Sequence, residues 1–182
     1  MFFAFCLIAA VLAVITGGNL NNLASLDIKR FSWIFASLVI RFVSEAASIE
    51  VSETAVIWSA ALFAACYGSL FYGLAANLRT PGIPLVAAGS LLNFAVILLN
   101  SFRMPVSLNA FDAGVRSREA ARLAASLTHT VLDSSTRLPF LADIFQWNYF
   151  SASPSMLSVG DFVIAAGAGW LLYRASKPRF FS

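Results

Sequence analysis

The stretch that decides the fold is AVIWSAALFAACYGSLFYGLAA, residues 55–76, which contains no charged side chain. A second charge-free run, GIPLVAAGSLLNFAVILLN, follows at residues 82–100. A helix needs about 20 mostly apolar residues to cross the hydrocarbon core of a bilayer. A surface helix of a water-soluble domain would instead carry a polar stripe. The two runs therefore predict a polytopic membrane protein.

The composition of the whole chain agrees with a membrane protein. Hydrophobic residues make up 59% of the 182 residues and charged residues only 12%, whereas about 25% of a typical soluble domain is charged. The mean hydropathy is +0.80. This length fits one compact membrane domain, residues 1–182, without an additional soluble domain. The net charge of +3 is small and the basic residues are scattered, which argues against nucleic-acid binding.

The apolar segments of the chain predict an all-α integral membrane protein. We expect five transmembrane helices, at residues 2–16, 31–49, 55–76, 82–100 and 156–174. The pair Gly17-Gly18 ends the first segment, because glycine stops a helix and lets the backbone turn. That segment also has the length of a signal peptide. Its opening, MFFAFC, carries no positive charge and no small-x-small cleavage pattern follows, so we expect an uncleaved helix.

The basic residues of the connections predict how the chain is oriented. Lysine and arginine in short loops are retained on the cytoplasmic side of the membrane. The residues that follow this rule lie after the first, third and fifth segments: Lys29, Arg30, Arg79, Arg174, Lys177 and Arg179. We therefore expect the N-terminus outside, the C-terminus in the cytoplasm and the long connection, residues 101–155, outside.

Two parts of the long connection have a recognisable pattern. Apolar residues recur at helical spacing over residues 115–131, which predicts an amphipathic helix. This helix either lies on the outer membrane surface or caps the bundle, and the sequence favours neither. The apolar stretch 138–147 is too short to span a bilayer, so we expect a re-entrant or interfacial segment there.

Several short strings resemble a known family. They are Asn100-Ser101-Phe102-Arg103-Met104-Pro105-Val106-Ser107, then His129, then the stretch Thr136 to Ile144, and then Ser158-Val159-Gly160-Asp161. In this order they resemble an uncharacterised family of small bacterial membrane proteins, catalogued as domain of unknown function 5317. The resemblance covers nearly the whole chain. It implies a protein of the bacterial cytoplasmic (inner) membrane and supplies no reaction.

The polar residues in and near these strings are the candidate site. We expect them to gather at the outer face: Asn100, Arg103, His129, Arg137, Asp143 and Asp161. Arginine suits an anionic headgroup, because its planar fork donates two parallel hydrogen bonds to phosphate or carboxylate. The structural alternative, which we favour, is that the arginines pair with the aspartates and tie the long loop to the bundle.

One further pair lies within a predicted span. Arg41 and Glu45 are one helical turn apart, and a buried arginine in a membrane needs a partner, so we expect an ion pair between them.

The only histidine, His129, has no cysteine, histidine or clustered acid beside it, so a metal site is not expected. No other cofactor is expected, because the chain carries no phosphate-binding loop, nucleophile elbow or zinc signature.

These features favour two functions. The first is an accessory or interaction subunit that packs against a larger membrane protein complex or a second copy of itself. The absence of a strong catalytic motif, the small-residue helix faces and the 17 phenylalanines support it, and argue against an enzyme. The alternative is a protein or enzyme that binds a lipid or isoprenoid headgroup through the outer arginine, histidine and aspartate side chains. Membrane lipids are expected partners in both cases.

Overall fold

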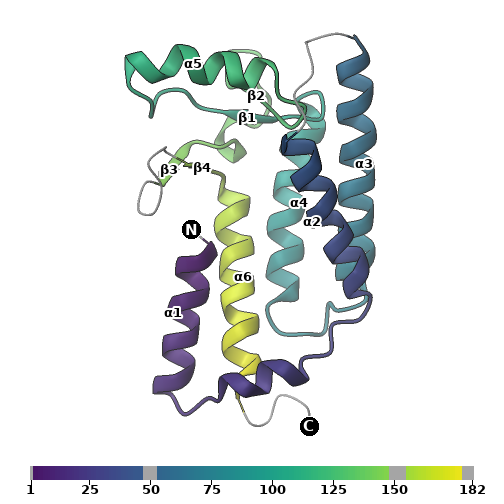
Figure 1. Ribbon diagram of the computed structural model, residues 1–182, viewed down its shortest axis with the longest axis vertical. Helices are drawn as coiled ribbons and strands as arrows, with labels where there is room; N and C mark the ends of the chain where they lie inside the picture. The colour runs from purple at the N-terminus through teal and green to yellow at the C-terminus, as the bar shows by residue number, and fades with distance from the viewer. Residues whose placement is uncertain (1, 47–52, 148–154, 178–182) are drawn as a thin grey trace.

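The computed structural model describes residues 2–46, 53–147 and 155–177, and its long helices run side by side (Figure 1). These helices are α1 (Phe2–Ile15), α2 (Phe31–Ala46), α3 (Glu53–Ala75), α4 (Ile83–Leu99) and α6 (Val159–Ala175). The 3-10 helix η1 (Leu20–Ser25) lies at one end of the bundle, and α5 (Ala113–Ala124) lies across the other. The expectation of a mostly helical chain is confirmed, and each of the five expected segments overlaps one long helix.

The long connection corrects the prediction of an all-α fold. Strand β1 (Met104–Val106) pairs in parallel with β2 (His129–Val131), and β3 (Phe145–Trp147) pairs antiparallel with β4 (Ser155–Leu157). The parallel pair forms because residues 104–106 are buried and their backbone groups need partners. Those partners come from β2 on one side and from a bridge between Val106 and Asp143.

The two expected segments of this connection also differ from the structure. Helix α5 ends at Ala124, seven residues before the end of the predicted helix, buries Leu123 and packs against β2. The chain then turns, and residues 129–131 join the sheet. Residues 138–147 form a 3-10 helix, η2 (Pro139–Leu141), followed by β3, and no re-entrant helix. The Phe140 ring is exposed, whereas Leu138 and Leu141 pack against the buried cluster that includes Phe63 and Val96, so the bundle covers only part of this apolar stretch.

Glycines bring α4 and α6 into close contact. A Cβ atom added at Gly89 would lie 2.5 Å from the carbonyl oxygen of Gly160, and one at Gly167 would lie 2.7 Å from that of Gly82. Each of these two helices therefore meets the other through two glycines that are seven residues apart and lie on one face of the helix. Helix α1 packs on the other side of α6, and α2 packs along α3. The aromatic rings of Phe63 and Phe94 stack at 5.0 Å and join α3 to α4.

Length and composition identify one membrane span among the described helices. Residues Val56–Ala75 are long and apolar enough to cross a bilayer, and only 22% of their most apolar window is buried. Two shorter apolar helices cover Ala4–Ile15 and Ile83–Leu99. At about 1.5 Å per residue, the 17 residues of α4 extend roughly 25 Å, less than the roughly 30 Å hydrocarbon core.

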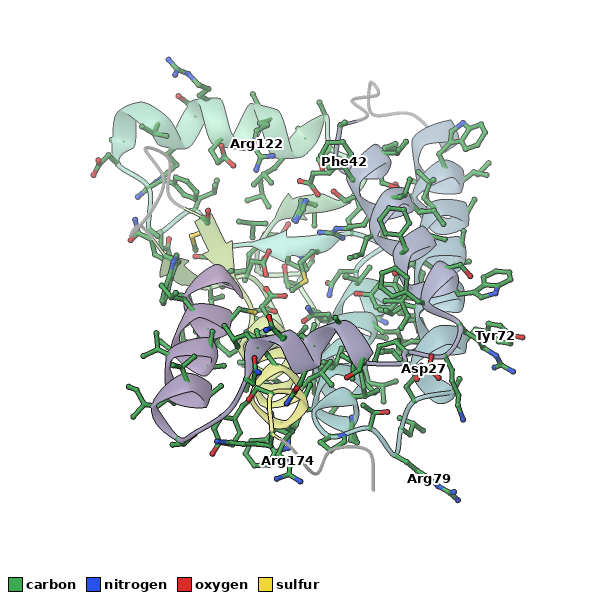
Figure 2. All side chains as sticks on the ribbon, turned by 60° about the horizontal axis from the view of Figure 1, so that its bottom comes forward. Asp27, Phe42, Tyr72, Arg79, Arg122 and Arg174 are labelled. Atoms are coloured by element: carbon green, nitrogen blue, oxygen red, sulfur yellow. The ribbon has the colours of Figure 1, made fainter. Side chains whose placement is uncertain are left out.

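The polarity of α2 is inverted relative to a helix of a water-soluble protein. Its buried residues are Ser37 and Ser44. Large apolar side chains point outward instead, with Phe42 75% exposed and Val43 56% exposed. Figure 2 shows Phe42 on the outer surface of this helix, and it places Arg79 and Arg174 at the end of the bundle opposite Arg122.

Candidate functional site

A cavity of about 460 Å³ separates the α2–α3 pair from the α4–α6 pair. Its apolar lining comes from all four helices and includes Leu38, Leu70, Leu74, Val86, Ile164 and Leu171. Polar side chains line it toward the end of the bundle where α2 and α4 finish and α6 begins. They are Arg41, Tyr67, Ser90, Asn93 and Asp161, and Ser37 lines the cavity one helical turn before Arg41. An apolar cavity with a few convergent polar groups is the usual form of a small-molecule site.

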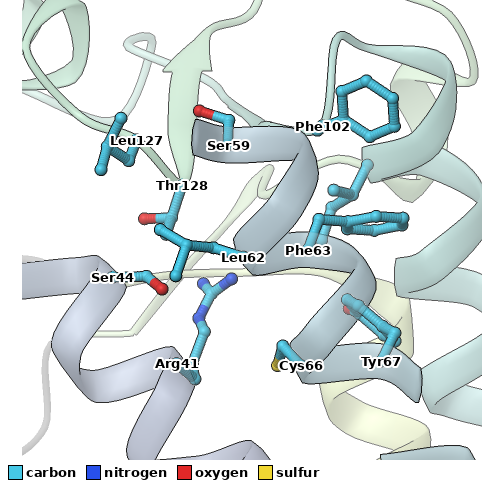
Figure 3. Close-up of a pocket in the computed structure, with 11 residues that line it drawn as sticks. Arg41, Ser44, Ser59, Leu62, Phe63, Cys66, Tyr67, Phe102, Leu127 and Thr128 are labelled. Carbon is cyan, nitrogen blue, oxygen red and sulfur yellow. The ribbon is translucent and has the colours of Figure 1, made fainter. Parts of the chain in front are cut away.

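Arg41 links this cavity to the layer of strands. Its Nη2 atom lies 3.6 Å from Oε2 of Glu45, so the structure brings together the two residues expected to form an intramembrane ion pair. The same Nη2 lies 3.3 Å from Nε2 of His129 on β2, a contact that the sequence did not suggest. Figure 3 shows the Arg41 side chain extending from α2 toward Leu62 and Thr128. A pocket of about 20 Å³ beside it has room for one water molecule.

The hydrogen bonds of Thr128 indicate which ring nitrogen of His129 carries the proton. The Thr128 hydroxyl donates to Oε2 of Glu45 at 3.0 Å and lies 2.9 Å from Nδ1 of His129. A hydroxyl has one proton to donate, so Nδ1–H must donate to Thr128 in turn. The Nε2 atom then carries the lone pair and accepts from Arg41. A neutral His129 with its proton on Nδ1 satisfies every one of these contacts.

The electrostatics of His129 agree with this neutral form. Burial lowers the pKa of His129 below its ordinary 6.5, and the Arg41 guanidinium lowers it further. A second buried group, Asp143, places Oδ2 at 3.9 Å from Nε2 of His129. Burial, reinforced by the negative charge of Asp161, raises the pKa of the Asp143 carboxyl to about 8. At neutral pH the pair is therefore a carboxylic acid beside a neutral imidazole.

The backbone holds Asp143 in place although its side chain is incompletely bonded. Its N–H donates to the Pro105 carbonyl, and its own carbonyl accepts from the Ser107 N–H, both at 2.9 Å. The Oδ1 atom is buried and has no hydrogen-bond partner in the described part of the chain. A buried polar atom of this kind is uncommon and marks a position under special constraint.

Asp161 belongs to a separate network at the start of α6. It forms a capping box with Ser158, in which each residue's side chain accepts from the other's backbone N–H, at 2.9 and 3.0 Å. Asn93 on α4 donates to Oδ1 of Asp161 at 2.9 Å and accepts from the Ser158 hydroxyl at 2.9 Å. The capping box stabilises the helix start, and Asn93 locks α4 to α6 at the polar end of the cavity.

The remaining candidates lie on a different face, in a groove at the end of α4. The Asn100 side chain donates to the Arg137 carbonyl and accepts from the Arg137 N–H, both at 2.9 Å. Arg103 and Arg137 line this groove together. The groove has a volume of about 480 Å³, and its lining is largely polar.

The structure thus divides the six-residue cluster expected from the sequence into three groups. They are Asn100 with Arg103 and Arg137, His129 with Asp143, and Asp161 with Asn93 and Ser158. Neither arginine forms an ion pair with Asp143 or Asp161, so no arginine–aspartate clasp ties the loop to the bundle. The clasp fails because each aspartate is fixed by its own backbone, at the β1 edge and at the helix N-terminus. Within the described ranges, no three His, Cys, Asp or Glu side chains gather as metal ligands do.

Several site residues were missed by reasoning from sequence. The Ser158-x-x-Asp161 spacing is a capping-box pattern that could have identified Ser158. Asn93 is a polar residue within the predicted span 82–100, which favours an interior position but does not indicate its partner. Thr128 and Tyr67 carry no local signal, because their role depends on which distant segments pack beside them.

The chain belongs to a family of unknown function, DUF5317, whose model matches residues 25–173. This match covers every element of the cavity, from α2 to α6. No curated protein and no solved structure matches the chain.

Proposed function

We propose that this protein is a polytopic protein of the bacterial cytoplasmic membrane that binds a lipid or isoprenoid in the cavity between its two helix pairs. The observation that carries the proposal is the shape and polarity of that cavity. Its walls are apolar along most of its length, and its polar groups converge at one end. This arrangement matches a molecule with one polar head and a hydrocarbon tail.

The membrane location is supported by the surfaces of the helices. The buried side chains of α2 are Ser37 and Ser44, while Phe42 and Val43 face outward. In water this pattern would leave a large exposed apolar surface, whereas lipid tails solvate it without cost. The Val56–Ala75 helix agrees, because the core helix of a soluble protein would be mostly buried rather than 22% buried.

The proposed orientation has the N-terminus outside and the C-terminus in the cytoplasm. Arg79 and Arg174 lie at the same end of the bundle, together with Lys29 and Arg30 on the connection before α2 (Figures 1 and 2). Positive residues favour the cytoplasmic side. The strands and α5 are then outside, and the polar end of the cavity lies toward the outer leaflet.

The charges of the cavity indicate the kind of headgroup. Among the described residues that line it, Arg41 and Asp161 are the charged ones, and their formal charges cancel. Asn93 and Ser90 add uncharged hydrogen-bonding groups. We therefore expect a headgroup without net charge, either zwitterionic or carrying hydroxyl or carbonyl groups.

Native mass spectrometry of the full chain, extracted in mild detergent, tests this proposal. We expect wild-type protein to retain one lipid-sized ligand. Ala168→Phe should expel it, because this residue lines the cavity. Ala88→Phe is the matched control, since Ala88 is exposed on α4 outside the cavity lining. If Ala168→Phe retains the ligand at wild-type occupancy, the cavity is not the binding site.

A second candidate function, an accessory subunit of a larger membrane complex, is supported by a different surface. An apolar groove of about 520 Å³ runs between α1 and α6, where small residues such as Ala9, Ala166 and Gly169 alternate with larger ones. Small residues allow another membrane helix to approach closely. The native mass in the same experiment tests it: a mass above that of one chain supports this function, and a monomer does not.

A further inference from the structure

We propose that the groove formed by Arg103 and Arg137 at the end of α4 binds a phosphate group. This site is separate from the cavity and does not depend on what the cavity binds. The groove lies between the end of α4, strand β2 and residues 133–137. Besides the two arginines, its lining includes the hydroxyl side chains of Ser101 and Thr130, which can donate to an anion.

The charges of the groove favour an anion. Neither guanidinium forms a hydrogen bond or an ion pair with another side chain in the part of the chain that the structure describes. One acid, Asp133, also lines the groove. Its Oδ1 accepts from the N–H and hydroxyl of Ser135 at 2.8 and 2.7 Å, which ties it to its own turn. Two arginines and one aspartate leave the groove with a net positive charge, and the guanidinium fork fits phosphate.

The backbone at this site is held in an uncommon conformation. Ser101 and Phe102 both have positive φ, 57° and 62°, a conformation that residues other than glycine rarely adopt. The Phe102 ring packs on Phe63, with centroids 5.5 Å apart, and Asn100 bonds both backbone groups of Arg137. These contacts turn the chain back at the end of α4 and set Arg103 beside the anchored backbone of Arg137. A site fixed in this way loses little entropy when it binds.

The rim of the groove indicates where the phosphate comes from. Leu98 and Leu99 belong to its lining and are 43% and 42% exposed. A phosphate bound above exposed leucines at the end of a proposed membrane helix has the surroundings of a phospholipid headgroup. A water-soluble phosphate would present the same group to the arginines. The experiment must therefore distinguish a phospholipid headgroup from a free phosphate.

The test compares ligands that differ in the phosphate. Purified full-length protein is titrated with phosphatidylglycerol and with diacylglycerol, which lacks phosphate, and binding is followed by native mass spectrometry. Inorganic phosphate is titrated by calorimetry. We expect phosphatidylglycerol to bind at least tenfold more tightly than diacylglycerol. Phosphatidylglycerol binding without inorganic phosphate binding assigns the site to a lipid headgroup, whereas binding of both assigns it to the phosphate group from either source.

Arginine variants connect that binding to the groove. Arg103→Gln/Arg137→Gln should weaken phosphatidylglycerol binding at least tenfold, and each single variant should give a smaller loss. Arg116→Gln/Arg118→Gln on exposed α5 removes the same charge at the same end and should change binding less than twofold. Equal losses in the two double variants, or equal binding of diacylglycerol by wild-type protein, would overturn the proposal. Ala168→Phe should keep phosphatidylglycerol bound, so failure of the cavity proposal leaves this one intact.

Discussion

The Nη2 atom of Arg41 lies 3.3 Å from the Nε2 atom of His129, which joins helix α2 to strand β2 across 88 positions of sequence. One guanidinium thus contacts the outer layer of strands and also lines the cavity between the helix pairs. The four predictions below test this connection, the packing of the helices and the orientation in the membrane.

Removing the Arg41 side chain should lower the amount of folded protein. Arg41→Ala removes the cation that Glu45 and His129 share, and a carboxylate without a counter-charge within a membrane is costly. Lys29→Ala is the control, because Lys29 is exposed and its backbone, rather than its ammonium group, bonds Asn77. Monodisperse yield by fluorescence-detected size exclusion measures the difference. Equal yields of the two variants would contradict a structural role for the Arg41 contacts.

In the wild type, the free energy of unfolding should decrease as pH rises from about 6.5 to 8. Asp143→Asn should abolish this decrease. Between its ordinary pKa of 3.8 and about 8, folded Asp143 keeps a proton that the unfolded chain has lost, so the free energy of unfolding falls as pH rises. His129, whose pKa is lowered from 6.5, has the opposite effect in the acidic part of that range. The net decline in the wild type should therefore fall between about pH 6.5 and 8.

Melting temperatures at pH 6.5, 7.25 and 8 measure this effect. The wild type should lose stability across the series, whereas Asp143→Asn should stay level, because asparagine resembles the protonated acid. Asp133→Asn is the control: hydrogen bonds from Ser135 lower the pKa of this exposed carboxyl, so it does not titrate in this range. A wild type with a flat profile would show that Asp143 is ionised in the folded protein.

Gly167→Ala should separate α4 from α6. The added Cβ would lie 2.7 Å from the Gly82 carbonyl oxygen and the Val86 nitrogen, both of which belong to a backbone that cannot yield locally. Overpacking of this kind costs about 1–3 kcal/mol. Gly68→Ala is the matched control, since nothing lies within 4 Å of its added Cβ. That change should be neutral or stabilise α3 by up to about 1 kcal/mol. Thermal unfolding of both variants in one detergent compares them, and similar melting temperatures would argue against tight α4–α6 contact.

Cysteine labelling should report opposite sides of the membrane for α5 and the α3–α4 turn. With Cys6 and Cys66 replaced by alanine, Ser117→Cys should react with a membrane-impermeant thiol reagent in spheroplasts. Arg79→Cys should react only after the membrane is permeabilised, because the positive end of the bundle is expected in the cytoplasm. Both positions are exposed in the structure. The reverse pattern would invert the proposed orientation.

The sequence determined the helices because their signals are local. The charge-free runs at 55–76 and 82–100 mark α3 and α4, and the Arg41–Glu45 spacing places both side chains on one helix face. The Ser158–Asp161 capping box is likewise contained within four residues. In each case, neighbouring residues alone supply the hydrogen bonds or the hydrophobicity, so a short window of sequence is sufficient to predict the element.

Only the tertiary structure decided which polar groups meet. Thr128 and His129 reach Glu45 and Arg41, and Asp143 lies beside His129, because β1 needs backbone partners on both edges and finds them in β2 and residue 143. Likewise, glycine contacts on α4 and α6 set the distance between those helices, and the two helix pairs leave a cavity between them. These contacts join segments that are tens of residues apart, and their free energy depends on how the whole chain packs. A polar residue in a loop therefore shows what it can bind, while the fold around it selects its partner.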